Sequence, residues 1–243
     1  AAMMSVVNPG DKVIIFSPFY ENYGADTILS GAEPIYVPLH PPLFNFNVDE
    51  LEAAFRQHPK ALILCNPSNP CGKVFTRDEL ELIAGLAKKY DVYVITDEVY
   101  EHIVYAPHTH TYFAALPGMW ERTISCSSLS KTYSVTGWRL GYACGPAPII
   151  KIMTKIHQSA IMSAPTTSQY AAITALKECD GEIDRMRDEY NMRRRLVVKA
   201  FNDMGLTCFE PRGAFYAFPC IKSTGMSSQD FCTKLLEQKH VAI

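Results

Sequence analysis

The 243-residue sequence has little excess charge of either sign. Its 23 lysine and arginine residues stand against 25 aspartate and glutamate residues, for a formal net charge of −2. A nucleic-acid surface needs a clear excess of positive charge, so we expect no nucleic-acid partner. The opening residues 1–7 are too short to span a bilayer and carry neither a basic flank nor a cleavage-site pattern. We therefore expect a cytoplasmic protein with no membrane partner.

The cysteines show no pairing pattern. There are eight, without a Cys-x-x-Cys motif, and most lie in or beside apolar runs. This distribution favours buried thiols in a reducing cytoplasm over disulfides or a metal site. His108 and His110 are spaced like a ligand pair, but the residues around them are typical of an exposed loop. We expect no metal.

The chain alternates between strand and helix patterns, without internal repeats. A capping box formed by Thr76 and Glu79 starts the clearest helix. Short apolar runs predict strands at 12–17, 34–38, 61–64, 92–96, 123–127 and 140–144. This alternation predicts an α/β fold with a mostly parallel sheet.

Beyond residue 146 the pattern becomes mainly helical. We predict helices at 149–157, 166–177, 182–204 and 228–239, strands at 206–209 and 214–218, and the start of a strand at 240–243. A smaller α/β unit therefore follows the large one. We place the boundary near Arg187, with a large domain over 1–186 and a small, incomplete one over 187–243.

Three polar residues follow the predicted ends of successive strands. These are Asn69, Asp97 and Lys131. Ligands of open parallel sheets bind beyond the carboxyl ends of the strands. If the strands are neighbours, the three side chains share one crevice.

Lys131 lies in a crowded polar turn at residues 125–142, which reads SCSSLSKTYSVTGWRLGY. The planar fork of Arg139 and the serine hydroxyls suit a phosphate, and a buried lysine can act as nucleophile and base. A phosphate-bearing aldehyde would use both, and pyridoxal phosphate is such a molecule. On this stretch alone, a solvated loop remains the alternative. We expect Trp138 to lie in the core.

Five motifs extend this interpretation. From about Val7 to Ile243 the chain resembles the fold-type I pyridoxal-phosphate aminotransferases of class I/II, the group of the aspartate and aromatic aminotransferases. The motifs are AsnProSerAsnProCysGly at 66–72, ThrAspGluValTyr at 96–100, SerLeuSerLys at 128–131, GlyTrpArgLeuGlyTyr at 137–142 and ProArgGlyAlaPheTyrAlaPhe at 211–218. The resemblance implies a three-layer α/β/α large domain and a small α/β domain.

The resemblance also implies catalytic roles. Lys131 would form a Schiff base with pyridoxal 5′-phosphate and move a proton during the reaction. Asp97 would pair with the pyridine nitrogen, so that the protonated ring accepts electrons. Tyr100 and Asn69 would donate to the phenolic oxygen and lower the basicity of the imine.

Further residues match cofactor contacts of the family. Ser128, Ser130 and Arg139 correspond to phosphate ligands. Tyr20 corresponds to the aromatic residue that stacks on the pyridine ring, although Phe19 or Tyr23 is an alternative for this place.

The implied function is an aminotransferase that moves an amino group between an L-amino acid and a 2-oxo acid, as a homodimer. The alternatives are a pyridoxal-phosphate lyase of the same fold, or an inactive fragment that persists as a dimerisation module. Family members also have an N-terminal turn that binds the phosphate and a C-terminal arginine for the substrate carboxylate. This sequence contains neither, so we expect a portion of a longer protein or a truncated product.

Overall fold

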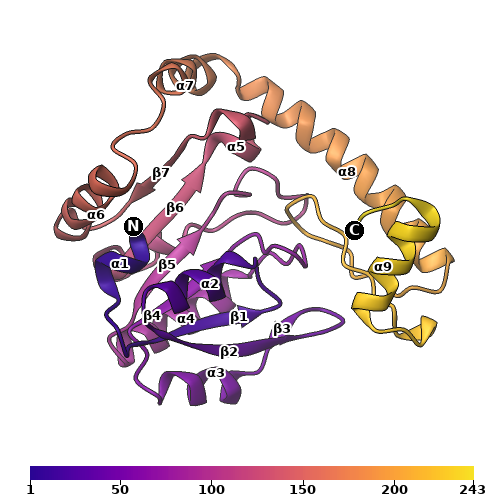
Figure 1. Cartoon of the computed structure of the whole chain (residues 1–243), viewed down its shortest axis with the longest axis horizontal. Coiled ribbons are helices and arrows are strands. Elements are labelled where there is room, and N and C mark those ends of the chain that lie inside the picture. The colour runs from indigo at the N-terminus through magenta and orange to yellow at the C-terminus, as the bar shows by residue number, and fades with distance from the viewer.

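The computed structural model describes residues 1–243 and is built around one seven-stranded sheet with the order β3-β2-β1-β4-β5-β6-β7 (Figure 1). The five strands β2, β1, β4, β5 and β6 run parallel, and the edge strands β3 and β7 are antiparallel to their neighbours. The strands are β1 Lys12–Ser17, β2 Glu33–His40, β3 Asn45–Phe46, β4 Ala61–Cys65, β5 Tyr93–Asp97, β6 Thr123–Ser128 and β7 Gly141–Cys144. The predicted α/β class is confirmed. Only β3, with two residues, has no counterpart among the predicted strands.

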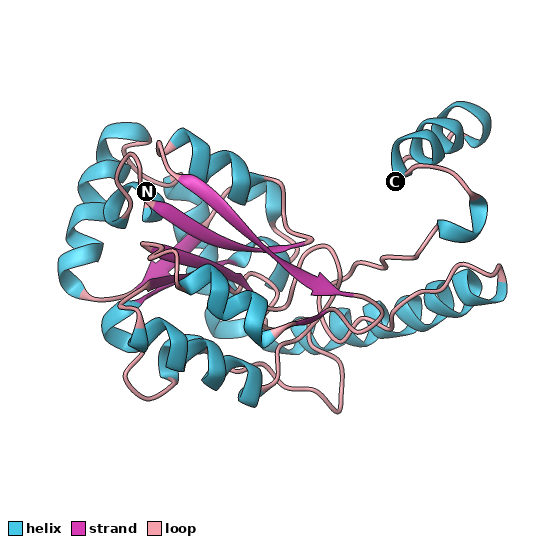
Figure 2. Ribbon diagram, turned by 90° about the horizontal axis from the view of Figure 1, so that it is seen from below, coloured by secondary structure: helices cyan, strands magenta, loops and turns pink.

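Helices lie on both faces of the sheet, and α8 and α9 extend away from it (Figure 2). They are α1 Ala2–Val6, α2 Asn22–Leu29, α3 Val48–Phe55, α4 Arg77–Lys89, α5 Leu129–Thr132, α6 Ala147–Ala160, α7 Thr166–Glu178, α8 Asp180–Asp203 and α9 Ser228–Lys239. The capping box predicted for α4 is confirmed, because the Thr76 hydroxyl and the Glu79 carboxylate each accept a hydrogen bond from the backbone N–H of the other residue. None of these helices has both the length and the apolar character needed to cross a membrane.

Alternating side chains of β1 build two separate cores. Ile14 and Phe16 belong to the cluster that contains the buried faces of α3 and α4. Val13 and Ile15 belong to the opposite cluster, with buried residues of α1 and α6. A strand that is covered on both faces must be apolar at consecutive positions, which explains the run VIIF in this strand. The result is a three-layer arrangement with the sheet in the middle.

The strands predicted at 206–209, 214–218 and 240–243 were wrong. Isolated bridges join Cys208 to Pro219 and Val104 to Gly213, but no strand forms, and Figure 2 shows loop between α8 and α9 apart from one short helical turn. Ala214 has a φ of 57°, a left-handed conformation that interrupts a regular strand. The domain boundary near Arg187 falls inside the continuous helix α8 and stays a prediction.

Instead, the segment 211–216 docks on the turn 66–74 that follows β4. The backbone N–H groups of Arg212 and Gly213 both donate to the carbonyl oxygen of Gly72, at 2.8 and 3.0 Å. Two motifs that are far apart in the sequence therefore form one packed unit.

The glycines of these motifs allow the close approach. Gly72 has a φ of +68°, and a Cβ at this position would lie 2.4 Å from the Cβ of Pro211. A Cβ at Gly213 would lie 2.8 Å from side-chain atoms of Pro67. Neither position has room for a side chain.

We expect Gly72→Ala to lower the free energy of unfolding by about 2–4 kcal/mol, because it combines a positive φ with a steric clash. The matched control is Gly85→Ala on the exposed face of α4, where an added Cβ meets nothing within 4 Å. This change should stabilise the protein by about 0.5–1 kcal/mol through helix propensity. Urea unfolding followed by circular dichroism measures both. Equal effects of the two substitutions would contradict the docking.

Candidate active site

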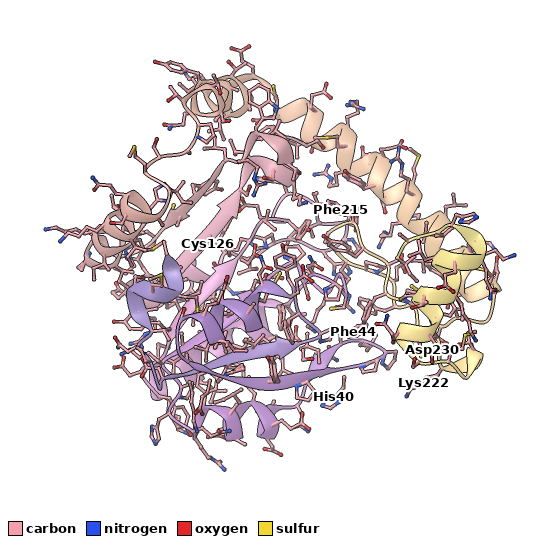
Figure 3. The ribbon with its side chains drawn as sticks, viewed as in Figure 1. His40, Phe44, Cys126, Phe215, Lys222 and Asp230 are labelled. Atoms are coloured by element: carbon pink, nitrogen blue, oxygen red, sulfur yellow. The ribbon has the colours of Figure 1, made fainter.

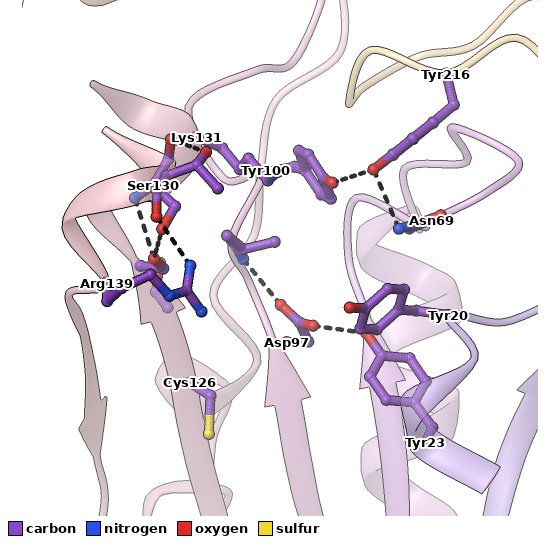
Figure 4. Close-up of a pocket in the computed structure, with 14 residues that line it drawn as sticks. Tyr20, Tyr23, Asn69, Asp97, Tyr100, Cys126, Ser130, Lys131, Arg139 and Tyr216 are labelled. Carbon is purple, nitrogen blue, oxygen red and sulfur yellow. Dashed lines mark hydrogen bonds between the residues drawn. The ribbon is translucent and has the colours of Figure 1, made fainter. Parts of the chain in front are cut away.

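The carboxyl ends of three adjacent strands form one pocket of about 350 Å³ (Figure 4). Asn69 lies in the turn after β4, Asp97 ends β5, and Lys131 lies in α5 directly after β6. The expected common crevice is therefore present. The pocket is lined by all eight residues selected from the sequence, namely Tyr20, Asn69, Asp97, Tyr100, Ser128, Ser130, Lys131 and Arg139. It also contains Tyr23, which was an alternative for ring stacking, and five residues that were not selected, namely Val99, Cys126, Ser127, Thr136 and Tyr216.

Asp97 presents a partly buried carboxylate to this pocket. Its Oδ2 accepts a hydrogen bond of 2.6 Å from the Tyr23 hydroxyl, and its Oδ1 accepts one of 3.2 Å from the backbone N–H of Val99. Burial raises the pKa of this carboxyl above its ordinary value, and the two hydrogen bonds partly oppose that rise. No ion pair of the structure includes Asp97. The site therefore holds a carboxylate without a cationic partner from the protein.

Lys131 reaches the same pocket from the short helix α5. The helix begins at Ser128, whose Oγ accepts a hydrogen bond of 3.0 Å from the backbone N–H of Ser130. The Lys131 Nζ lies 5.4 Å from the centre of the Phe215 ring and is bound to no carboxylate. Its amine is therefore free to bind a ligand.

Hydroxyls and a guanidinium gather beside this lysine. The Oγ atoms of Ser128 and Ser130 lie 2.8 Å apart, and Arg139 donates from Nη1 to the carbonyl oxygen of Thr136 at 2.8 Å. Arg139 forms no ion pair with a carboxylate. Several neutral donors with one arginine form a donor set that suits a phosphate.

Trp138 is not a core residue, contrary to expectation. Its side chain is 50% exposed, because it lies in the short helical turn Thr136–Trp138 at the surface. Its neighbour Arg139 has a left-handed backbone with a φ of 54° and lines the pocket.

A tyrosine from the C-terminal part of the chain completes the pocket wall. The Tyr216 hydroxyl lies 2.5 Å from the Tyr100 hydroxyl and accepts a hydrogen bond of 3.2 Å from Nδ2 of Asn69 (Figure 4). Burial raises the pKa of both tyrosines. Sequence reasoning matched the motif 211–218 without giving its tyrosine a role. The position of that motif in the family pattern was the signal that could have identified it.

The three aromatic candidates for ring stacking separate clearly. Phe19 stacks on Tyr36, with ring centres 5.1 Å apart and planes 12° apart, and does not line the pocket. Tyr23 is tied to Asp97 through its hydroxyl. Tyr20, 39% exposed, lines the pocket and has its ring edge-on to Tyr23. Of the three, Tyr20 has the ring that remains available to a flat ligand, and its assignment to ring stacking stays a prediction.

The side chain of His110 is buried, whereas the rest of its loop, 106–109 and 111, is exposed or partly exposed as expected. The His110 side chain is 6% exposed, and its Nε2 lies 3.3 Å from Oε1 of Glu98, which is 2% exposed. Glu98 follows Asp97 directly in the sequence, and its Oε1 also accepts a hydrogen bond of 3.4 Å from the backbone N–H of Phe113. The His110 ring lies beside a buried carboxylate, although neither ring nitrogen forms a hydrogen bond.

Comparisons with known proteins agree with this geometry. The sequence matches the family described as aminotransferase class I and II over residues 1–243. The putative aminotransferase YugH of Bacillus subtilis is 44% identical over 243 residues, which are 100% of this chain and 63% of that protein. The aspartate aminotransferase of Pyrococcus abyssi is 41% identical and is matched over 99% of this chain and 63% of its own length.

A solved structure gives the same result. The aromatic aminotransferase from Pyrococcus horikoshii OT3 superposes with a TM-score of 0.95 at 41% identity, covering 99% of this chain and 65% of that one. The chain belongs to the class I and II aminotransferases. It spans about 63% of the length of the curated relatives described above.

We expect the partly buried carboxyl of Asp97 to make the stability of the cofactor-free chain depend on pH. Because its pKa is raised on folding, its contribution to stability is fully present below about pH 4 and is lost as the pH rises through the raised value. Asp97→Asn removes the titrating group, so the variant should not lose this stability as the pH rises. The free energy of unfolding that it keeps relative to the parent is about 1.4 kcal/mol for each unit by which folding raises the pKa of Asp97.

The measurement is a series of urea unfolding curves between about pH 4 and pH 8, the range that brackets the titration of a raised carboxyl. Asp26→Asn, at an exposed carboxyl on α2, controls for the removal of one charge. A stability difference between the parent and Asp97→Asn that does not change with pH would contradict the burial argument.

Proposed function

We propose that this chain carries the active site of a pyridoxal-phosphate-dependent aminotransferase that moves an amino group between an L-amino acid and a 2-oxo acid. The observation that supports this most directly is the presence in one pocket of the amine of Lys131, the unpaired, partly buried carboxylate of Asp97 and the donor cluster around Arg139. Membership of the aminotransferase family supports the same reaction.

The donor set fits the cofactor at three places. A partly buried carboxylate without a protein cation suits a protonated pyridine nitrogen. Lys131 supplies an amine for the aldehyde, and Ser128, Ser130 and Arg139 supply donors for a phosphate. When bound, pyridoxal phosphate supplies a ring that accepts electrons from the substrate carbon.

Each side chain then has a defined task. Lys131 would hold the aldehyde group of the cofactor through Nζ, and its free amine would accept and return a proton at that atom. Asp97 would keep the ring nitrogen protonated, and Tyr23 orients Asp97 by donating to Oδ2. Tyr20 would place its ring against the face of the cofactor.

The names of the relatives suggest amino donors, and exposed apolar side chains suggest a subunit contact. Relatives carry the names of aspartate and aromatic aminotransferases, so amino acids of these two classes are the donors to test first. Tyr170 and Leu176 on α7 and Leu196 on α8 are 71%, 59% and 70% exposed, which supports a subunit contact in a homodimer. From the unpaired cysteines we also propose that the protein is cytoplasmic. From the change of sequence pattern we propose a large domain over 1–186 and a small one over 187–243.

We expect the purified chain, loaded with pyridoxal phosphate, to convert L-aspartate or an aromatic amino acid into its 2-oxo acid when 2-oxoglutarate is supplied. The amino group should appear on the acceptor in equal amount, without release of ammonia. Lys131→Ala should lower the rate by at least about 10²-fold, because the base at the reacting carbon is lost. Chromatography of the products and an ammonia assay measure these quantities.

Lys155→Ala, at an exposed lysine on α6, is the matched control and should leave the rate unchanged. Ammonia with a cleaved side chain would instead indicate a lyase of the same fold. Tight cofactor binding without any product would favour a dimerisation module, and either result would contradict the proposal.

A further inference from the structure

The hydroxyl of Tyr216 is the only side-chain group of the segment 211–216 that forms hydrogen bonds inside the pocket, and it joins two residues that come from different strands. It lies between Asn69, in the turn after β4, and Tyr100, beyond the end of β5. The sequence resemblance assigns Asn69 and Tyr100 to the phenolic oxygen of the cofactor but gives Tyr216 no role. The role of the Tyr216 hydroxyl must therefore be inferred from the hydrogen bonds that it forms.

The backbone around Tyr216 holds this hydroxyl in place. The N–H of Ala214 donates to the carbonyl oxygen of Ile103 at 2.8 Å, and the carbonyl oxygen of Ala214 accepts a bond of 2.5 Å from the Tyr105 hydroxyl. Phe215 packs between Tyr190 of α8 and Tyr100, with ring centres 5.4 and 5.2 Å away. Figure 3 shows Phe215 between α8 and the strand ends.

Counting hydrogens leaves two possible directions for the bond between the two tyrosines. The Asn69 amide has two hydrogens, so one can serve Tyr216 while the other stays available to the pocket. Only one hydrogen fits between the two tyrosine oxygens, which are 2.5 Å apart. If Tyr216 provides that hydrogen, the hydrogen of Tyr100 is free to point into the pocket. A negatively charged acceptor near Tyr100 favours the arrangement in which Asn69 donates to Tyr216, Tyr216 donates to Tyr100 and Tyr100 donates to the acceptor. In such a chain each hydrogen bond polarises the next donor and strengthens its hydrogen bond.

We propose that Tyr216 is a positioning residue: its hydroxyl accepts from Asn69 and donates to Tyr100, and so directs the Tyr100 hydrogen toward the phenolic oxygen of bound pyridoxal phosphate. This inference rests on the proposed function. It makes the C-terminal segment part of the electrostatic control of the cofactor. A stronger donor at the phenolic oxygen lowers the basicity of the imine nitrogen formed with Lys131.

The experiment is a pH titration of the absorbance band of the cofactor bound to Lys131, in the parent chain and three variants. Tyr100→Phe should raise the pH midpoint by about one to two units, because a hydrogen bond to a charged oxygen is lost. Tyr216→Phe should raise it in the same direction by about 0.2 to 0.5 unit, because only the polarisation of Tyr100 is lost. Tyr105→Phe, which removes one anchor of the segment but no member of the hydrogen-bonded chain, should move the midpoint by less than Tyr216→Phe does.

The Tyr105 variant is the matched control because its hydroxyl anchors the same segment at Ala214 but does not line the pocket. A midpoint that moves in Tyr100→Phe and not in Tyr216→Phe would overturn the inference. So would equal shifts in Tyr216→Phe and Tyr105→Phe, which would indicate a general loosening of the segment.

Failure of the proposed function has a different signature. If the parent chain shows no absorbance band from cofactor bound to Lys131, the proposed function fails. The hydrogen-bonded pair of Tyr100 and Tyr216 is then tested in the cofactor-free chain. A double-mutant cycle of Tyr100→Phe and Tyr216→Phe in urea unfolding measures the coupling between the two hydroxyls. Non-additive effects support the hydrogen-bonded pair that the inference needs, and additive effects overturn it.

Discussion

The parallel register of β4, β5 and β6 is the constraint on which the site depends. Cys65 lies beside Asp97 in the sheet, and Asp97 lies beside Cys126, so β4 and β5 end at the same level and β6 continues only to Ser128. Backbone hydrogen bonds continue this alignment past the strands, from the N–H of Asn66 to Asp97 and from the N–H of Glu98 to Cys126. A shift of one residue would turn the carboxylate of Asp97 to the opposite face of the sheet. The close packing of differently shaped side chains on both faces opposes that shift.

The environment of Asp97 lowers the stability of the folded chain at a pH where the carboxyl is charged. Removal from water at the end of a buried strand disfavours the charged form of a carboxyl group unless a cation binds beside it. The protein supplies only neutral donors, from Tyr23 and from the backbone of Val99. A positively charged ligand atom bound at this carboxylate would compensate that cost, in agreement with the role proposed for Asp97.

Local patterns in the sequence were sufficient for much of this structure. The capping box at Thr76 and the apolar run at 12–17 depend on contacts within a few residues or on burial of both faces, and both were predicted correctly. The shared pocket of Asn69, Asp97 and Lys131 followed from strand order, because neighbouring parallel strands end at one edge.

Contacts between distant segments were not visible in the sequence. The bond from Tyr23 to Asp97 spans 74 residues, and that from Asn69 to Tyr216 spans 147. No local pattern specifies either pair. The apolar run 214–218 was predicted as a strand, because its composition gave no indication of the left-handed backbone at Ala214. The buried contact of His110 likewise involves Glu98, which lies in another segment.

The most direct measurement is the trapping of pyridoxal phosphate on the chain with borohydride, followed by peptide mass spectrometry. We predict one reduced pyridoxyl group, located on Lys131, and a large reduction of labelling in Asp97→Asn at limiting cofactor. Labelling spread over surface lysines such as Lys151 and Lys155, with none on Lys131, would contradict the conclusion that the strand ends of this chain assemble the cofactor site.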